Sequence, residues 1–322
     1  MTGNAPGLPI ARATGATRHQ QIAFLVMAGF FILAPAVIYP VFLMKLMCFA
    51  LFACAFNLLI GYVGLLSFGH AMFFGIAGYA TAHSAKVWGF TPELAILFGT
   101  ASAGVLGLLV GLLAIRRLGI YFAMITLALA QMVFFFCLQA PFTGGEDGIQ
   151  AVPRGKLLGL IDLTSASTMY PFVLAIFLGG FLLIYRIVHS PFGQVLKAIR
   201  ENESRAVSLG YDVERYKLLA FVLSATLAGL AGGTKSLVFQ LASLTDVHWT
   251  MSGEVVLMSL VGGLGTIFGP VVGAAVIITM QNYLAQLGAW VTVVQGIVFV
   301  VCVLAFRRGI IGEIAHAIKK PL

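Results

Sequence analysis

The sequence predicts an all-α polytopic membrane protein with about ten transmembrane helices. Apolar residues make up 60% of the 322 residues and charged residues only 9%, whereas a soluble domain carries roughly 25% charged residues. The mean hydropathy is +1.02. The apolar residues are gathered in separate runs, and a hydrocarbon core about 30 Å thick needs about 20 such residues per helix. These observations exclude a water-soluble globular protein.

Ten runs have the length of a membrane span, because charge, Pro or Gly interrupts the apolar pattern between them. The predicted helices lie near 22–39, 41–60, 68–87, 93–115, 118–139, 171–188, 217–240, 253–265, 270–287 and 289–306. The eighth run is short and rich in Gly, and the sequence from 60 to 70 is equally interrupted by Gly. Each of these two regions is a candidate for a discontinuous helix, which membranes tolerate only beside protein or a watery cavity.

The basic residues set the orientation, since short cytoplasmic loops are enriched in Lys and Arg. Ten crossings put both termini on one side, and most of the 19 Lys and Arg residues fall there. Both termini are therefore predicted to be cytoplasmic, and the net charge of +8 reflects topology and not nucleic-acid binding. We expect a disordered cytoplasmic tail over 1–21, a transmembrane domain over 22–306 and a basic cytoplasmic tail over 307–322.

The segment 190–217, SPFGQVLKAIRENESRAVSLGYDVERYK, holds an unusual concentration of charge for this chain. Ser190 and Pro191 fit the start of a helix. Apolar residues then recur on one helical face, at Phe192, Val195, Leu196 and Ile199. The spacing predicts one amphipathic helix on the cytoplasmic side.

A second short helix fits Glu203 to Leu209, with Ala206 and Leu209 on one face. Gly210 is placed to end it in the left-handed conformation, and Asp212 to cap the next membrane helix. One interpretation is a solvated loop whose charges only obey the topology rule. Balanced charge, a defined stop and an apolar stripe favour the other, a rigid docking surface.

Neither an ATP site nor a redox or metal site is evident from the motifs. A phosphate-binding loop needs G-x-x-x-x-G-K-S/T, and the nearest string, GLAGGTKS at 229–236, has Thr234 in place of the second Gly. The cysteines Cys48, Cys54, Cys137 and Cys302 lie inside apolar runs without a C-x-x-C pair, which predicts simple packing. We therefore expect a non-catalytic chain with no metal and no cofactor of its own.

Five stretches between about 40 and 310 resemble, in order, the permease subunits of ATP-binding cassette importers for branched-chain amino acids, of the LivM type. They are NLLIGYVGLLSFGHAMFFGIAGYA (57–80), LGIYFAMITLALAQM (118–132), TGGEDGI (143–149), SPFGQVLKAIRENESRAVSLGYDVERYKLLAFVLSATLAGLAG (190–232) and GEVVLMSLVGGLGTIFGPVVGAA (253–275). The resemblance implies a multi-pass protein of the bacterial inner membrane that forms half of a translocation pathway.

The resemblance also implies partners. Cassette ATPase subunits would bind ATP and Mg²⁺, a second permease, LivH-like or another copy, would complete the pathway, and an extracytoplasmic binding protein would deliver substrate. Related importers carry Glu-Ala-Ala, three residues, Gly in the coupling loop; here only Ala206 and Gly210 match, because Ser204 and Arg205 occupy the first two places. The implied ATPase-coupling residues are Arg200, Glu201, Glu203, Arg205, Ala206, Leu209 and Gly210.

Polar and glycine residues near the interrupted runs are candidates for the pathway. We expect pore lining by Asn57, Ser67, His70, Thr126, Gln131, Glu254 and Ser259. Helix-break positions are predicted at Gly61, Gly64, Gly69, Gly262, Gly263, Gly265 and Gly269. The alternative for each glycine is close packing of helices through small residues.

Ionisable residues inside spans are costly and suggest function. Glu254 is expected near the outer end of its span, where it either caps that helix beside Ser252 or gates the pathway. His70 is expected to be a neutral hydrogen-bonding group. Lys45 and Lys235 are expected to extend toward the outer surface.

The outer loop of residues 140–170 is the longest extracytoplasmic segment. The resemblance implies that a contact with the binding protein, or an outer gate, comprises Thr143, Gly144, Gly145, Glu146 and Asp147. The alternative is a tight turn that holds the loop on the membrane surface.

Several functions compete at this point. An importer subunit for branched-chain or related amino acids is favoured, and a permease of the same family for urea or another small polar solute is an alternative. A secondary transporter or channel would normally carry coupling carboxylates near the membrane midplane, where this sequence has few. An intramembrane enzyme ranks last, because catalytic motifs are lacking.

Overall fold

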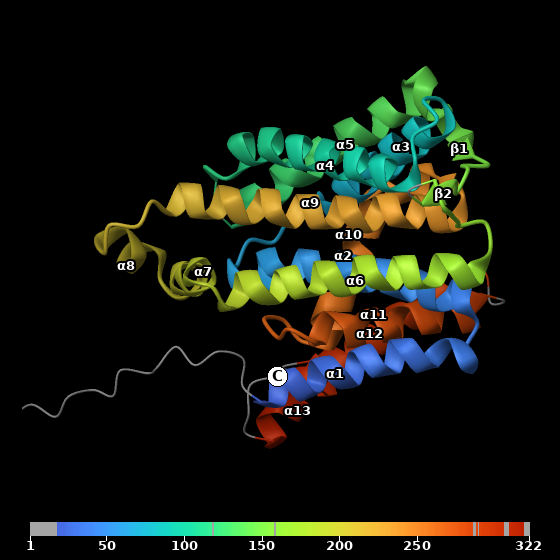
Figure 1. The fold of residues 1–322 in the computed structure, drawn as a ribbon. Coiled ribbons are helices and arrows are strands. Elements are labelled where there is room, and N and C mark those ends of the chain that lie inside the picture. Colours follow the sequence, from blue (N-terminus) through green and yellow to red (C-terminus); the bar gives the residue numbers. More distant parts are fainter. Residues whose placement is uncertain are drawn as a thin grey trace, which may run out of the picture.

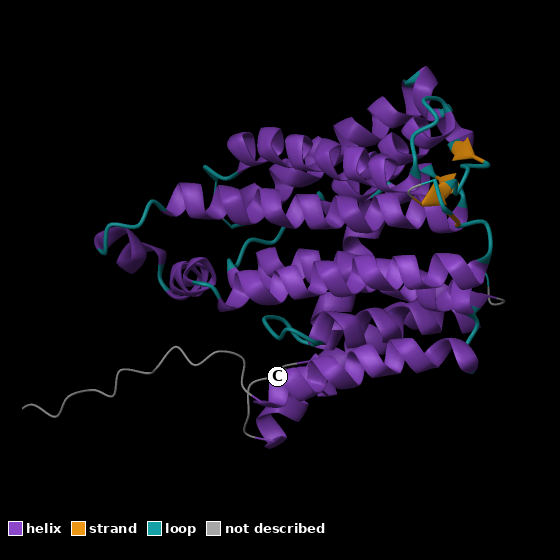
Figure 2. Cartoon of the chain, in the orientation of Figure 1, coloured by secondary structure: helices purple, strands orange, loops and turns teal. Residues whose placement is uncertain are grey.

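The computed structural model describes residues 18–117, 119–157, 159–285, 288, 290–305 and 309–318 (Figure 1). Helices account for most of the described chain (Figure 2). The long helices are α1 (Arg18–Leu33), α2 (Pro40–Tyr62), α3 (His70–Lys86), α4 (Pro92–Ala114), α5 (Ile120–Gln139), α6 (Ala166–His189), α9 (Val213–Phe239), α10 (Trp249–Gly262), α11 (Gly269–Tyr283) and α12 (Trp290–Ala305).

Shorter elements connect and terminate these helices. They are α7 (Pro191–Glu201), α8 (Glu203–Ser208), α13 (Gly309–Ile318) and the 3₁₀ turns Ala34–Ala36, Pro141–Thr143, Gly145–Asp147 and Leu244–Asp246. Two antiparallel ladders pair β1 (Ile149–Gln150) with β4 (Leu241–Ala242), and β2 (Lys156–Leu157) with β3 (Ile161–Asp162). The prediction of an all-α chain missed these ladders. They give hydrogen-bond partners to backbone N–H and C=O groups of loop residues, which lie outside the helices.

Each of the ten predicted spans coincides with one helix, with small shifts at the ends. Among the described residues, α2, α4, α5, α6 and α9 are long and apolar enough to cross a membrane by themselves. The chain is a mostly helical polytopic membrane protein. One boundary was wrong: α1 begins at Arg18, so residues 18–21 are helical and do not belong to a disordered tail. Residues 1–17 and 319–322 of the two predicted tails lie outside the described residues.

Helix α2 forms the centre of the bundle. Every residue from 46 to 59 is buried, because α6, α9, α10 and α11 all pack around this helix. Helix α9 in turn packs on α3 and α4. A helix that is apolar on all sides is typical of a position surrounded by other helices.

The bundle has two distinct ends (Figure 1). One carries α7 and α8, which together with the flanking residues make up the segment 190–217, called the knob below. The opposite end, called the hairpin end, carries β1 and β2. Helix α7 is seen end-on in Figure 1, so it runs across the direction of the neighbouring bundle helices.

Candidate functional site

The first half of the knob forms the predicted amphipathic helix. The side chain of Ser190 accepts a hydrogen bond from the backbone N–H of Gly193, and Pro191 occupies the first turn of α7. Leu196 and Ile199 are buried on its inner face. The cap and the apolar spacing therefore place this helix as the sequence predicted.

The second half of the knob is a short helix with its own small core. The side chain of Asn202 caps α8 by accepting from the N–H of Arg205. Ile199, Ala206 and Val213 are buried together. This cluster holds α7, α8 and the start of α9 as one unit.

The end of α8 matches the prediction in one respect and differs in another. Gly210 has φ +87°, the left-handed conformation that favours glycine, and Asp212 caps α9 through the N–H of Arg215. However, α8 ends at Ser208, so Leu209 does not share the buried face of Ala206 and is 68% exposed.

An ion pair fixes α8 to α9. The ammonium of Lys217 lies 2.7 Å from the carboxylate of Glu203, and the lysine side chain is only 4% exposed. A buried charge requires such a partner. Glu203 is therefore engaged within the knob, whereas the neighbouring Arg205 is exposed.

The tip of the knob exposes apolar side chains. Val207, Leu209 and Tyr211 are 57%, 68% and 40% exposed. They lie on one short stretch next to the exposed Arg205 and Gly210. Apolar groups gathered on a charged, projecting element are typical of a surface that binds another protein.

Arg200 connects α7 to the two glycine-rich interruptions of the bundle. Its guanidinium donates to the backbone carbonyl of Gly61, at the end of α2. A Cβ on Gly265 would lie 3.0 Å from the same guanidinium. A cavity of about 470 Å³ between these parts is lined by Gly61, Tyr62, Lys197, Arg200, Glu201 and Gly265.

Lys197 adds a second contact between α7 and α2. Its ammonium lies 5.7 Å from the centre of the Tyr62 ring, a cation–π distance. Burial lowers the pKa of Lys197. The knob end of α2 is thus in contact with two basic residues of α7 that are three positions apart on the helix.

The two glycine-rich regions meet each other. The side-chain amide of Asn57 donates to the carbonyl of Thr266 at 2.8 Å, and its oxygen accepts from the N–H of Gly265 at 3.0 Å. A Cβ on Gly61 would lie 2.7 Å from that same backbone nitrogen. This close approach explains the glycine at position 61.

Five of the other glycines predicted at helix breaks fall into two groups. Gly64, Gly263 and Gly265 have positive φ and belong to the loops 63–69 and 263–268 at the knob end. Gly262 and Gly269 instead allow α10 and α11 to approach, since an added Cβ would meet the backbone of the other helix or its loop. The interruptions are loops between successive helices, so a break within a single helix is not what the structure has.

Most of the predicted pathway residues bind the protein itself. Asn57, Ser67, His70, Thr126 and Ser259 are buried and each makes a hydrogen bond to the protein. Gln131 is half-buried on α5. Glu254 alone among the seven lines one of the described cavities.

His70 joins three helices at the start of α3. Its Nε2 lies 2.8 Å from the hydroxyl of Ser224, which itself donates to the carbonyl of Ala55. Because the Ser224 hydroxyl gives its one proton to Ala55, the Nε2–H of the imidazole is the donor to Ser224. Phe56 and Phe73 surround it edge-on. This geometry suits the neutral hydrogen-bonding role expected for His70.

A polar cavity of about 570 Å³ lies toward the hairpin end. It is lined by Lys45, Phe49, Lys235, Phe239, Leu241, Ser243, Thr245, Asp246, Met251, Glu254, Gln281 and Gln295. Four ionisable side chains and two amides thus converge between α2, α9, α10, α11 and α12.

Two ionisable residues of this region have surroundings that the sequence did not predict. Lys235 extends over the Phe239 ring toward the hairpin end, where its ammonium pairs with Asp246 at 2.6 Å; the two side chains are 12% and 9% exposed, so the ammonium is paired and not solvated. Glu254 does not cap a helix: α10 begins at Trp249 with His248 as its cap, and the hydroxyl of Ser252 accepts from the N–H of Ala71.

Sequence reasoning missed Asp246, Gln281 and Gln295 and gave Lys45 and Lys235 no role. A signal was present, since lysines within apolar spans are rare and usually have a partner. The partner Asp246 lies outside the helix of Lys235, in a 3₁₀ turn. That turn folds back over the end of α9 only in the tertiary structure.

The stretch Thr143–Asp147 forms a compact turn at the hairpin end. Thr143 is buried, and its one hydroxyl proton is shared between the carbonyls of Cys137 and Ala140. Glu146 and Asp147 are not buried. The turn is therefore rigid and presents two acids to solvent.

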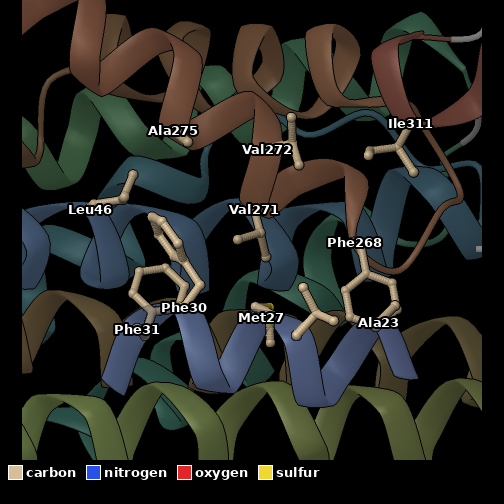
Figure 3. Close-up of a pocket in the computed structure, with 11 residues that line it drawn as sticks. Ala23, Met27, Phe30, Phe31, Leu46, Phe268, Val271, Val272, Ala275 and Ile311 are labelled. Atoms are coloured by element: carbon tan, nitrogen blue, oxygen red, sulfur yellow. The ribbon is translucent and has the colours of Figure 1, made fainter. Parts of the chain in front are cut away.

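A separate pocket of about 410 Å³ lies between α1, α2 and α11 (Figure 3). Its lining is apolar throughout and comprises Ala23, Val26, Met27, Phe30, Phe31, Leu46, Phe268, Val271, Val272, Ala275 and Ile311. It offers no group that would orient a polar solute. Within the described residues no cluster of three or more His, Cys, Asp or Glu is placed to hold a metal ion.

Comparison with known proteins relates these features to a family. Residues 40–303 match the family model described as branched-chain amino acid transport system / permease component. The high-affinity branched-chain amino acid transport system permease protein LivM of Escherichia coli K12 is 24% identical over 288 residues, covering 82% of this chain and 68% of LivM.

Two further relatives are informative. The ribose import permease protein RbsC of Bacillus subtilis is 32% identical over 240 residues, covering 69% of this chain and 70% of RbsC. The probable branched-chain amino acid transport permease protein LivH of Methanocaldococcus jannaschii is 34% identical over 122 residues, covering 38% of this chain and 36% of LivH. No solved structure matches the chain.

The family model extends from the start of α2 almost to the end of α12, so it covers the central helix, both glycine-rich loops, the knob and the polar cavity. The chain belongs to the family of branched-chain amino acid transport system permease components.

Proposed function

We propose that this chain is the permease subunit of an ATP-binding cassette importer in the bacterial inner membrane. It forms half of the pathway for branched-chain or related amino acids and is driven by separate cytoplasmic ATPase subunits. The observation that carries the proposal is the knob, whose apolar tip projects from the bundle while its Arg200 binds the end of α2 and lies against Gly64 and Gly265 of the two glycine-rich loops. Similarity to LivM supports the amino acid as substrate, and similarity to LivH supports a second permease as partner.

The proposed topology has ten crossings, with both termini and the knob in the cytoplasm. Arg116 and Arg117 follow α4, and Arg186 lies in the last turn of α6; these two helix ends are at the end of the bundle that carries the knob. This distribution supports the cytoplasmic assignment. Helix α10 has 14 residues and spans only about 21 Å, so the turn before it or the glycine loop after it enters the hydrocarbon core.

The proposed mechanism couples ATPase closure to the helices through rigid parts. An ATPase subunit binds the tip of the knob at Arg205, Val207 and Leu209, because exposed apolar side chains there favour contact with another protein. Movement of α8 passes to α7 through the shared core of the knob. Arg200 then displaces the loops 63–69 and 263–268 together, which changes the angle between α2 and α3 and between α10 and α11.

At the opposite end, the proposal places a binding protein that delivers substrate. The rigid turn Thr143–Asp147 and its two solvent-facing acids form the contact. This end also lies next to the polar cavity, so substrate released there has a short way into the bundle. The pathway would open alternately to the two sides.

Co-purification tests the docking step. The chain, tagged and extracted from its native membrane in mild detergent, is expected to carry ATPase subunits and a second permease, identified by mass spectrometry. Leu209→Asp should remove the ATPase without lowering the melting temperature, because Leu209 is exposed. Leu160→Asp, an exposed leucine at the hairpin end, is the control. Full ATPase recovery with Leu209→Asp would contradict docking at the knob.

Transport in liposomes tests the function itself. We expect uptake of L-leucine to require ATP and the binding protein. The similarity to RbsC supports a second candidate, import of a sugar, which uptake of D-ribose under the same conditions would favour. Uptake by the chain alone, without ATP, would identify a secondary transporter or channel instead.

A further inference from the structure

The polar cavity toward the hairpin end contains more charge than its own ion pair uses. Lys235 and Asp246 neutralise each other at 2.6 Å. Lys45 and Glu254 line the same cavity and attract each other across it, but within the described residues neither touches an opposite charge. One positive and one negative group are therefore left facing the same space.

The two amide side chains of the cavity differ in whether they have a partner. The side chain of Gln281 lies beside the carboxylate of Glu254 and interacts with it. Gln295 is only 6% exposed, yet its side-chain nitrogen has no hydrogen-bond partner among the described residues. A buried donor without a partner costs about 1–3 kcal/mol, so a donor in this position indicates a molecule that completes the site.

Apolar side chains complete the lining. Phe49, Phe239 and Met251 lie beside the charged groups. The volume of about 570 Å³ falls in the range typical of small-molecule sites. The cavity thus combines a cation, an anion, a free amide donor and an apolar wall.

We propose that this cavity is a binding site for a zwitterionic α-amino acid on its way through the permease. The carboxylate of the ligand binds Lys45 and the amide of Gln295, its ammonium binds Glu254, and its apolar side chain packs on Phe49 and Phe239. The proposal rests on the proposed importer function and adds to it the site and the charge pattern of the substrate.

The charges discriminate against an uncharged ligand. Ionisable residues at membrane depth are expensive and are kept where a partner or a substrate needs them. Lys45 and Glu254 attract each other across the cavity but are not in contact. A sugar would be bound by hydroxyl and amide groups and would leave both without a charged group in contact. An α-amino acid supplies one charge of each sign.

Uptake by the complete importer in liposomes tests the role of the two charges. Lys45→Gln and Glu254→Gln should each lower L-leucine uptake per ATP hydrolysed roughly tenfold, since a hydrogen bond to a charged group is worth about that factor or more. The control is Lys86→Gln, which removes an exposed lysine at the same end of the bundle. Wild-type uptake in both cavity variants would overturn the proposal.

Thiol labelling tests the site without transport. Cys48, Cys54 and Cys137 are buried, so Met251→Cys in a Cys302→Ser background gives one reactive thiol in the cavity. We expect L-leucine to slow its labelling in the purified chain, and D-ribose to leave it unchanged. The control is Val87→Cys, an exposed position at the hairpin end, which should label equally with and without leucine.

The outcomes separate the two proposals. Equal labelling of the Met251→Cys variant with and without L-leucine, or protection by D-ribose alone, would overturn the amino-acid site. Protection by leucine supports the site whether or not ATP drives transport. An importer that moves neither probe with ATP would instead contradict the proposed function.

Discussion

The two ends of the bundle use polar side chains in opposite ways. At the knob end, Asn57 binds backbone groups of the loop 263–268 and Arg200 binds the carbonyl of Gly61 at the end of α2, so their hydrogen bonds join segments about 140 to 210 positions apart in the chain. At the hairpin end, Lys45 and Gln295 line a cavity, and the side-chain nitrogen of Gln295 has no hydrogen-bond partner among the described residues. The comparison teaches that a buried polar side chain indicates a binding site only where the protein itself supplies no hydrogen-bond or ion-pair partner for it.

The largest expected effect sharpens the comparison at the hairpin end. Asp246→Asn leaves Lys235 buried without a counter-charge and should lower the free energy of unfolding by about 3 kcal/mol. Thermal unfolding in detergent measures the change. The double variant Lys235→Met with Asp246→Leu is the matched control and should recover most of the loss, because it buries no charge. An unchanged melting temperature in Asp246→Asn would show that the pair is not buried.

The corresponding experiment at the knob concerns Glu203. Glu203→Gln removes the partner of the buried Lys217 and should destabilise the knob by about 2 kcal/mol. Hydrogen exchange of residues 190–217 should rise. The control is Arg215→Gln, which removes the exposed ion pair with Asp212 and leaves the Asp212 cap of α9 in place. It should lower the free energy of unfolding by at most about 0.5 kcal/mol. Equal effects of the two substitutions would contradict the structural role of Glu203.

A smaller effect tests whether the knob drives the glycine-rich loops. Arg200→Ala removes the hydrogen bond to the carbonyl of Gly61 and should lower leucine uptake per ATP hydrolysed roughly tenfold, the equivalent of one charged hydrogen bond. ATP hydrolysis itself should persist. Gln194→Ala, an exposed position on α7, is the control. Uptake and hydrolysis that fall together would indicate loss of assembly and not of coupling.

The smallest expected effect concerns the end of α8. Gly210→Ala should cost about 1 kcal/mol, because φ is +87° although an added Cβ would meet nothing within 4 Å. Gly29→Ala is the control, since this helical glycine also lies in open space without a positive φ. If the melting temperature falls in Gly210→Ala and not in Gly29→Ala, the loss of stability comes from the backbone conformation at Gly210. Equal melting temperatures for the two variants would contradict the left-handed conformation of Gly210.

The sequence by itself determined the elements. Hydropathy predicted ten helices in their observed places, and the caps Ser190 and Asp212 and the stop at Gly210 were readable because capping depends on neighbouring residues alone. The family was also recognisable from five ordered stretches. These features are local or compositional, so no tertiary contact is needed to infer them.

Only the tertiary structure decided which polar side chains have hydrogen-bond or ion-pair partners. Asn57 and Glu254 looked equivalent as polar residues in apolar runs, yet Asn57 binds a loop more than 200 positions away and Glu254 lines a cavity. Lys235 looked free until a 3₁₀ turn placed Asp246 beside it. Hydrogen bonds and ion pairs between distant segments depend on how helices pack, and hydropathy carries no information about these partners.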